Sequence, residues 1–182
     1  MARTGKQRII EGALELLRTQ GGGSITLEAA AKQVGLTKPG LMYHFPTKEA
    51  LMLAVVDHVA ARWEQMMIDH LDGPLATASA AKRIRAYAEV ALTERFDRAD
   101  FAIFFDALYR DALTDAWVRR LQPWLALPDD LPAITRARLT AVRLAADGYW
   151  VAASTGVFAP ADRDHALLTD VLNTLLEDEN DR

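Results

Sequence analysis

The spacing of apolar residues constrains this chain more than any other feature of its sequence. Apolar side chains recur three and four positions apart, which places them on one face of an α-helix. Two such stripes are Ile10, Ala13, Leu14 and Leu17, and Phe101, Phe104, Phe105 and Leu108. No run of residues alternates steadily between apolar and polar side chains, as a half-buried strand requires. The sequence therefore predicts an all-α fold.

Glycine and proline divide the N-terminal part into short helical segments. The first segment ends at Gly21–Gly23, the second at Gly35 and the third at Pro46, because glycine is a weak helix former and proline cannot continue a helix. Thr26 and Thr37 immediately precede the second and third segments, where a threonine hydroxyl can cap a helix. We therefore expect three short helices before residue 46.

A longer helix follows and leads into the rest of the chain. Residues 48–71 contain neither glycine nor proline, so we expect one continuous helix there. Gly73-Pro74 is the clearest break in the chain. Beyond it we expect helices over residues 75–96, 98–112, 114–126, 133–158 and 162–178.

Charge is unevenly distributed along the chain. The formal net charge of the whole is −4. Residues 1–50 nevertheless carry seven Lys and Arg against four Asp and Glu, a net charge of +3, whereas the other 132 residues carry 14 against 21, a net charge of −7. A basic N-terminal segment on an acidic body suits a protein that offers one end to a polyanion.

The sequence offers little that enzyme chemistry needs. It has no cysteine, which excludes disulfides, thiol catalysis and cysteine-bound zinc. It contains no HExxH, GxSxG or phosphate-loop motif. No two histidines have the i, i+4 spacing of a metal-binding pair, since they are His44, His58, His70 and His165. We therefore expect no catalytic residues, no metal site and no cofactor.

The ends of the chain and its apolar runs bear on where the protein acts. The first residues, MARTGKQRII, are polar and charged, and lack the apolar centre of a signal peptide. No uncharged apolar run approaches the ~18 residues that a membrane span needs. We therefore expect a cytoplasmic protein with no membrane partner.

Residues 26–46 have the pattern of a helix-turn-helix. A short helix carries the small residues Ala29 to Ala31, a glycine follows at the turn, and Thr37 opens a second helix. Small contact residues let two helices cross closely, and glycine tolerates the left-handed backbone of a tight turn. The second helix of such a motif enters the major groove of DNA. This stretch therefore points to DNA binding.

Residues 5–55 resemble the N-terminal domain of the TetR family of transcriptional regulators. The matching parts are Ile9 to Leu17, Gly21 to Gly23, Thr26 with Ala30, Ala31 and Gly35, then Tyr43-His44-Phe45 and Lys48-Glu49-Ala50-Leu51. The resemblance implies a three-helix DNA-binding domain over residues 1–46 and a helical effector-binding and dimerisation domain over 47–182. Residues 47–71 would form the helix that joins the two.

The motif and the resemblance together identify candidate DNA contacts. The first turn of the recognition helix approaches base edges, and its free N–H groups favour a nearby phosphate. A lysine at the start of the fourth helix resembles the family's phosphate contact. The candidates are Thr26, Thr37, Lys38, Pro39, Gly40, Tyr43, His44 and Lys48. Thr37 and Pro39 could instead only start the helix, and His44 could be an ordinary surface residue.

The resemblance also implies a pocket for a small-molecule effector. Pockets are lined mainly by apolar and aromatic side chains with a few polar groups. The candidates are Trp63, Met66, Met67, Phe104, Phe105, Asp106, Tyr109, Trp117, Trp124, Asp147 and Trp150. The aromatic residues could equally be plain core. Acids that face a cavity would favour a cationic, apolar ligand, but Asp106 and Asp147 could instead pair with Arg110 and Arg143.

The last two expected helices resemble the family's dimer interface. The first of them carries small residues that allow close approach, Ala145, Ala146, Gly148, Ala152, Ala153, Ser154 and Gly156. The second carries an apolar stripe, Leu167, Leu168, Val171, Leu172 and Leu175, which could instead be core within one chain. Palindromic DNA operators require two recognition helices, so we expect a homodimer.

These observations predict a ligand-responsive transcriptional regulator. By resemblance it is a repressor, which a small effector releases from a double-stranded, palindromic DNA operator. DNA and effector would each lower the affinity for the other. The alternative is a helical adaptor or structural protein that binds no specific DNA sequence.

Overall fold

The computed structural model describes residues 4–20, 25–93 and 98–177, and every regular element within these ranges is a helix. The predicted all-α fold is confirmed. None of the described helices is both long enough and apolar enough to cross a membrane. The Gly21–Gly23 segment, expected to end the first helix, lies outside the described residues.

The chain forms two compact units. Unit 1 comprises Met1–Ala61 and Asp97–Arg120, and unit 2 comprises Arg62–Phe96 and Leu121–Arg182. Two helices, α4 (Lys48–Asp69) and α7 (Asp111–Leu125), contribute residues to both units. The expected domain boundary after residue 46 stays a prediction, because the two units are defined by how the chain packs and not by what each part does.

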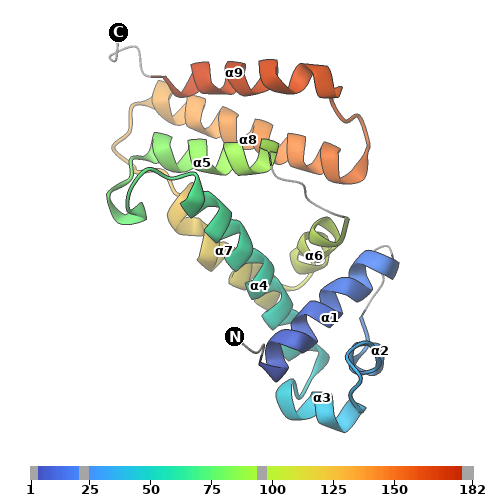
Figure 1. Cartoon of the computed structure of the whole chain (residues 1–182). Helices are drawn as coiled ribbons and strands as arrows, with labels where there is room; N and C mark the ends of the chain where they lie inside the picture. Colours follow the sequence, from blue (N-terminus) through green and yellow to red (C-terminus); the bar gives the residue numbers. More distant parts are fainter. Residues whose placement is uncertain (1–3, 21–24, 94–97, 178–182) are drawn as a thin grey trace. The chain divides into compact units, whose positions relative to one another are not determined.

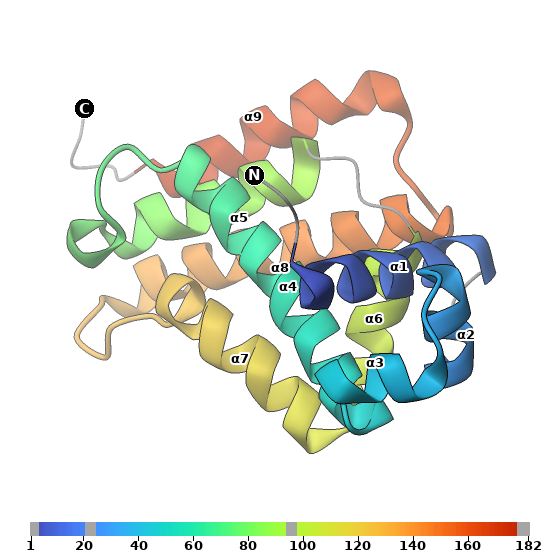
Figure 2. The ribbon, with the colours of Figure 1, turned by 60° about the horizontal axis from the view of Figure 1, so that its bottom comes forward.

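Unit 1 contains the three N-terminal helices. They are α1 (Gly5–Gln20), α2 (Leu27–Gln33) and α3 (Lys38–His44). Helix α1 packs against α2, α3 and α6 (Arg98–Leu108), and α2 packs against α3 (Figures 1 and 2). The expected inward stripe of α1 begins one residue early: Ile9 is fully buried, whereas Ile10 is only half-buried.

Threonine caps and one glycine fix the ends of the short helices. Thr26 Oγ1 accepts a hydrogen bond of 3.1 Å from Ala29 N–H. Thr37 Oγ1 accepts one of 3.2 Å from Gly40 N–H. Gly35 has a φ of 70°, a conformation that glycine adopts without steric cost. The predicted caps and the glycine turn of the helix-turn-helix are confirmed.

Unit 2 is built on three long helices that lie side by side in Figure 1: α5 (Ala80–Thr93), α8 (Ala133–Thr155) and α9 (His165–Leu176). Helix α5 packs against both α8 and α9, and α8 packs against α9. Short 3-10 turns, η1 (Leu75–Thr77) and η2 (Asp162–Asp164), precede α5 and α9.

Two helices of unit 2 are shorter than their apolar spacing predicts, for identifiable reasons. The expected helix over 75–96 begins only at Ala80, because Ser79 Oγ accepts the Lys82 N–H at 3.3 Å and caps a new helix. The expected helix over 133–158 ends at Thr155, because Gly156 takes up a left-handed backbone with a φ of 75°. Capping residues therefore set the start of α5 and the end of α8, although the apolar spacing continues beyond them.

Close packing of α1 on the end of α2 depends on Gly12. A Cβ atom at Gly12 would collide with Val34 Cγ1, and the β-branched valine side chain has little freedom to move away. We predict that Gly12→Ala lowers the free energy of unfolding by about 1–3 kcal/mol. Adding Val34→Ala should restore most of that loss. Urea unfolding of both variants measures this, and a Gly12→Ala chain as stable as the wild type would contradict it.

Candidate nucleic-acid interface and interior aromatic cluster

Helix α3 has one buried side and one displayed side. Leu41 is fully buried and Phe45, at its C-terminal cap, is 5% exposed. Tyr43 is 86% exposed, and Thr37 and Lys38 are exposed as well. Two apolar anchors thus hold the helix, while polar side chains at its start and on its outer side remain available to a partner.

The capping threonines already use their side-chain oxygens within the protein. Thr26 and Thr37 are exposed, yet each oxygen accepts a backbone N–H of its own helix. A Cβ atom at Gly40 would lie 3.3 Å from Thr37 Oγ1, so the missing side chain keeps this cap uncrowded. Pro39 is an exposed residue of the first turn. The helix-start roles are therefore present, and the DNA contacts of these residues stay predictions.

His44 is more than a solvated surface residue. It is half-buried, and its ring meets that of Tyr43 edge-on at 5.2 Å between centroids. A Cβ atom at Gly5 would lie 3.1 Å from two atoms of the His44 ring. Its ring thus packs between Tyr43 and the start of α1, which leaves Tyr43 as the more exposed of the two.

A cross-helix ion pair joins the starts of α2 and α3. Lys38 Nζ donates a hydrogen bond to Glu28 Oε1. This bond lowers the pKa of the Glu28 carboxyl below its ordinary value. Sequence reasoning missed Glu28, because ten residues and a turn separate it from Lys38 and no local spacing rule links them. Its position in the first turn of the helix before the recognition helix was the available signal.

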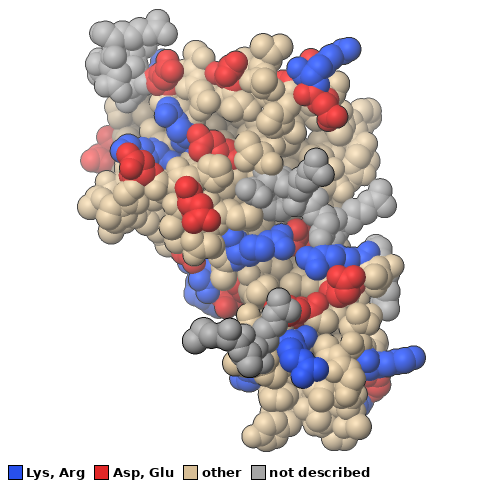
Figure 3. Space-filling model, in the orientation of Figure 1, with Lys and Arg blue, Asp and Glu red and all other residues tan. Residues whose placement is uncertain are grey.

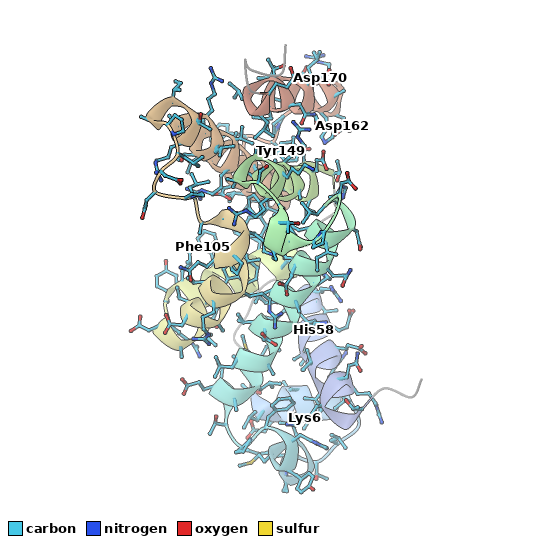
Figure 4. All side chains as sticks on the ribbon, turned by 90° about the vertical axis from the view of Figure 1, so that its left-hand side faces the viewer. Lys6, His58, Phe105, Tyr149, Asp162 and Asp170 are labelled. Atoms are coloured by element: carbon cyan, nitrogen blue, oxygen red, sulfur yellow. The ribbon has the colours of Figure 1, made fainter. Side chains whose placement is uncertain are left out.

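Further basic side chains come from α1 and from the start of α4. The ammonium of Lys6, labelled in Figure 4, lies 5.8 Å from the centre of the Phe45 ring. Arg8 Nη2 donates a hydrogen bond of 3.4 Å to Val34 O. Lys48, half-buried, is the first residue of α4. On the face drawn in Figure 3, basic and acidic side chains are interspersed and form no continuous basic patch among the described residues.

Unit 2 encloses an aromatic cluster that we call the interior cluster, formed by Trp63, Tyr87 and Trp150. The Trp63 ring stacks on Tyr87 with centroids 5.7 Å apart and meets Trp150 edge-on at 5.7 Å. All three residues are buried, as are Met67 and Trp124. Sequence reasoning found the tryptophans and missed Tyr87, although Tyr87 lies on the inward face of α5.

The interior cluster is tied to a charged pair. The Tyr87 hydroxyl donates a hydrogen bond to Asp147 Oδ1, and Arg143 Nη1 donates one of 2.7 Å to Oδ2. Burial, and then the nearby Asp147 carboxylate, raise the pKa of Tyr87 well above its ordinary value. The carboxylate is therefore already balanced by a cation. Asp106 likewise has Arg110 at 3.6 Å, so both ion pairs considered from the sequence are present.

The candidate pocket residues fall into two groups. The members in unit 2 are Trp63, Met66, Met67, Trp124, Asp147 and Trp150, and those in unit 1 are Phe104, Phe105, Asp106, Tyr109 and Trp117. In unit 1, Phe104 meets Trp117 at 5.6 Å and Phe105 at 6.1 Å between centroids. Phe105 (Figure 4) is 39% exposed and Tyr109 is 84% exposed, so these two lie at the surface of the single chain.

Helices α8 and α9 leave apolar surface uncovered in the single chain. Leu144, Leu167 and Val171 are 55%, 64% and 58% exposed. Ala145, Gly148 and Ala153 are exposed too, whereas Ala146 and Ser154, two other small residues of α8, are buried. Further along α8, Tyr149 packs edge-on against His165 at 5.7 Å, close to Asp162 (Figure 4).

Known proteins resemble this chain in sequence over about a third of its length. Tetracycline repressor protein class D of Escherichia coli is 36% identical over 62 residues, which are 34% of this chain and 28% of that protein. The regulator RutR of Escherichia coli K12 is 36% identical over 58 residues, 32% of this chain and 27% of RutR. The match thus spans little more than a quarter of each relative's length.

Solved structures resemble this chain over nearly its whole length. The multidrug binding protein EbrR, complexed with malachite green, has a TM-score of 0.67 at 21% identity and covers 97% of this chain and 100% of its own. A TetR family member of Streptomyces coelicolor A3 has a TM-score of 0.65 at 20% identity, covering 96% and 100%. Because the sequence identity is so low, these similarities establish the fold alone.

Two family descriptions match successive parts of the sequence. Residues 9–55 match the bacterial regulatory proteins of the tetR family. Residues 81–177, more than half of the chain, match the tetracyclin repressor-like C-terminal domain. The first match contains the helix-turn-helix, and the second contains α8, α9 and all of α5 except its first residue. The chain therefore belongs to the TetR family of bacterial regulatory proteins.

Proposed function

We propose that the protein is a transcriptional repressor that binds a palindromic DNA operator as a dimer and leaves it when a small molecule binds. One observation carries the proposal: α3 is anchored by buried Leu41 and Phe45 and displays Lys38 and Tyr43 to solvent. A rigid helix with its polar side outward is what major-groove recognition requires. Regulation of bacterial transcription takes place where the DNA lies, so we place the protein in the cytoplasm.

The displayed side chains divide into two kinds of DNA contact. Lys38 and Tyr43 project from α3 itself, so we assign them to base edges, which specify sequence. Lys48 starts the next helix, where an ammonium suits a backbone phosphate, which positions the protein without reading sequence. We give Thr26, Thr37, Pro39, Gly40 and His44 supporting roles at the same surface, because they set the ends and the packing of α2 and α3.

DNA binding is tested with duplexes that the wild-type protein selects from a random-sequence library, compared with unselected duplexes. We expect Lys48→Ala to weaken binding to both and to make the slope of log K against log salt shallower by about 1. We expect Tyr43→Ala to weaken binding to selected duplexes more than to unselected ones, since Tyr43 is 86% exposed and its loss spares the fold.

Mobility shifts at several salt concentrations supply these measurements. Tyr43→Phe is the matched variant, which separates the hydroxyl from the ring. Equal losses on both kinds of duplex would remove Tyr43 from sequence recognition. A wild-type protein whose binding is weak and indifferent to sequence would instead support the helical adaptor.

The dimer proposal rests on α8 and α9. Exposed Leu144, Leu167 and Val171 form apolar surface that a partner would bury, and exposed small residues beside them allow close approach. Burial of such surface stabilises association by about 25 cal/mol per Å² before the entropic costs. A two-fold axis relating two copies would also present two copies of α3 to a palindromic site.

Gly148 provides the sharpest test of this interface. A Cβ atom there meets nothing within 4 Å in the single chain, and alanine in a helix is favoured over glycine by about 1 kcal/mol. We predict that Gly148→Ala stabilises the separate chain but raises the dimer dissociation constant about tenfold or more, because the added methyl enters a packed interface.

Analytical ultracentrifugation over a range of concentrations measures this effect. Val118→Ser, which removes an exposed apolar side chain of α7, serves as the control and should leave association unchanged. Undiminished dimerisation of Gly148→Ala, or a wild-type chain that stays monomeric, would contradict the proposed interface.

We further propose that the effector is an aromatic, cationic compound that binds beside the interior cluster. Aromatic faces attract cations, and Asp147 adds a carboxylate next to Tyr87. EbrR, similar in fold, has been solved with ethidium and with malachite green. Helix α4 carries Lys48 at its start and Trp63 three-quarters of the way along, so it is the element through which bound effector would act on DNA affinity.

Calorimetric titration with ethidium and with decanoate, in the absence of DNA, tests the class of effector. We expect ethidium to bind and decanoate to bind weakly, because the carboxylate of Asp147 favours a cation. Asp147→Asn should weaken ethidium binding, whereas Asp170→Asn, which neutralises an exposed acid of α9, should not. Binding of decanoate alone would rule out a cationic effector.

A further inference from the structure

We propose that Glu28 is a specificity-determining residue of the DNA interface, and that with Lys38 it reads one G·C base pair in the major groove. This inference rests on the proposed DNA-binding function. It adds Glu28, an acidic residue, to an interface whose other candidate residues are neutral or basic. It also assigns the pair a base preference.

The geometry places a donor and an acceptor side by side at the displayed surface. Glu28 lies in the first turn of α2 and Lys38 in the first turn of α3. The Lys38 ammonium donates to Glu28 Oε1 although the two residues are ten positions apart in sequence. Their side chains remain 61% and 47% exposed, so both can also face a partner. The Glu28 carboxyl has a lowered pKa because of this bond, and it is ionised at neutral pH.

This pairing is complementary to one kind of base pair. In the major groove guanine presents two acceptors, N7 and O6, and cytosine presents the N4 amino donor. A lysine ammonium suits the guanine acceptors, and a glutamate carboxylate suits the cytosine donor. A joined ammonium and carboxylate therefore match a G·C pair with donor opposite acceptor and acceptor opposite donor. An A·T pair presents a different order of groups and a thymine methyl.

The same ion pair lowers the attraction of Lys38 for arbitrary DNA. A lysine that neutralises a phosphate releases a counterion and strengthens binding to any sequence. Glu28 already neutralises Lys38, and its own charge repels phosphates. Binding of Lys38 to a phosphate therefore brings a second anion next to the Glu28 carboxylate, whereas binding to a G·C pair brings the cytosine amino donor there. Glu28 thus favours selected over unselected DNA.

The test compares base preferences of four proteins: the wild type, Glu28→Gln, Lys38→Met and Glu15→Gln. Each selects duplexes from one random-sequence library, and the selected positions are compared. We expect a G·C pair at one position of each half-site for the wild type. Glu28→Gln and Lys38→Met should both lose the preference at that same position. Glu15→Gln is the matched control, since it removes an exposed acid paired with Arg18 on α1, and it should keep the preference.

Two further measurements distinguish recognition of a base pair by Glu28 and Lys38 together from a purely electrostatic effect of Glu28. Glu28→Gln should bind unselected duplexes up to about fivefold more tightly, with the slope of log K against log salt steeper by about 0.9. This gain should vanish when Lys38→Met is also present. In NMR titration of the free protein, the pKa of Glu28 should rise toward its ordinary value in Lys38→Met.

Each outcome decides the inference. An unchanged base preference in Glu28→Gln would overturn it, as would loss at a different position from Lys38→Met or a preferred pair other than G·C. A gain on unselected DNA that persists in the double variant would show that Glu28 acts through charge alone. A wild-type protein that binds no duplex would overturn the proposed function itself, while the NMR titration would still report the ion pair.

Discussion

Helix α3, the recognition helix of the proposed DNA interface, is stable because unit 1 buries two of its side chains. Helix α3 has seven residues, and isolated helices shorter than ~12–15 residues are marginal in water. Burial of Leu41 and Phe45 supplies the stability that its length does not. Helix α1 packs closely on the end of α2 at Gly12, and both of these helices pack against α3. The arrangement of every candidate DNA contact on α3 therefore depends on a small core that none of those contacts enters.

In unit 2, polar groups lie among large aromatic rings and need hydrogen-bond partners there. Tyr87 stacks on Trp63 and has its hydroxyl directed to Asp147. A buried hydroxyl without a partner would be costly, so this bond fixes the ring and the carboxylate together. Arg143 completes the set. The Tyr87 end of the interior cluster is thus held by hydrogen bonds, and any compound that binds beside it must compete with these bonds.

Much of the fold follows from local sequence, whereas the partners of side chains do not. Periodicity predicted the helices, and Thr26, Thr37 and Gly35 predicted the ends of the short ones. The apolar spacing predicted α5 to start too early and α8 to end too late, because it continues beyond the capping residues Ser79 and Gly156. Candidate contacts on α3 were placed by motif spacing. The roles of Glu28 and Tyr87 were not, because each pairs with a residue of another helix, and only packing brings such residues together.

The charge balance at Asp147 has a consequence for how such a regulator changes over time. Its counter-ion, Arg143, lies one turn away on the same helix and is about one-third exposed. Replacement of Arg143 by a neutral residue would leave the Tyr87 bond and the packing of the aromatic rings intact. The half-buried carboxylate of Asp147 would then lose its nearby cation. At the effector site that we propose, exchange of this single peripheral residue would therefore strengthen the preference for cations, which is a short mutational route to a changed range of ligands.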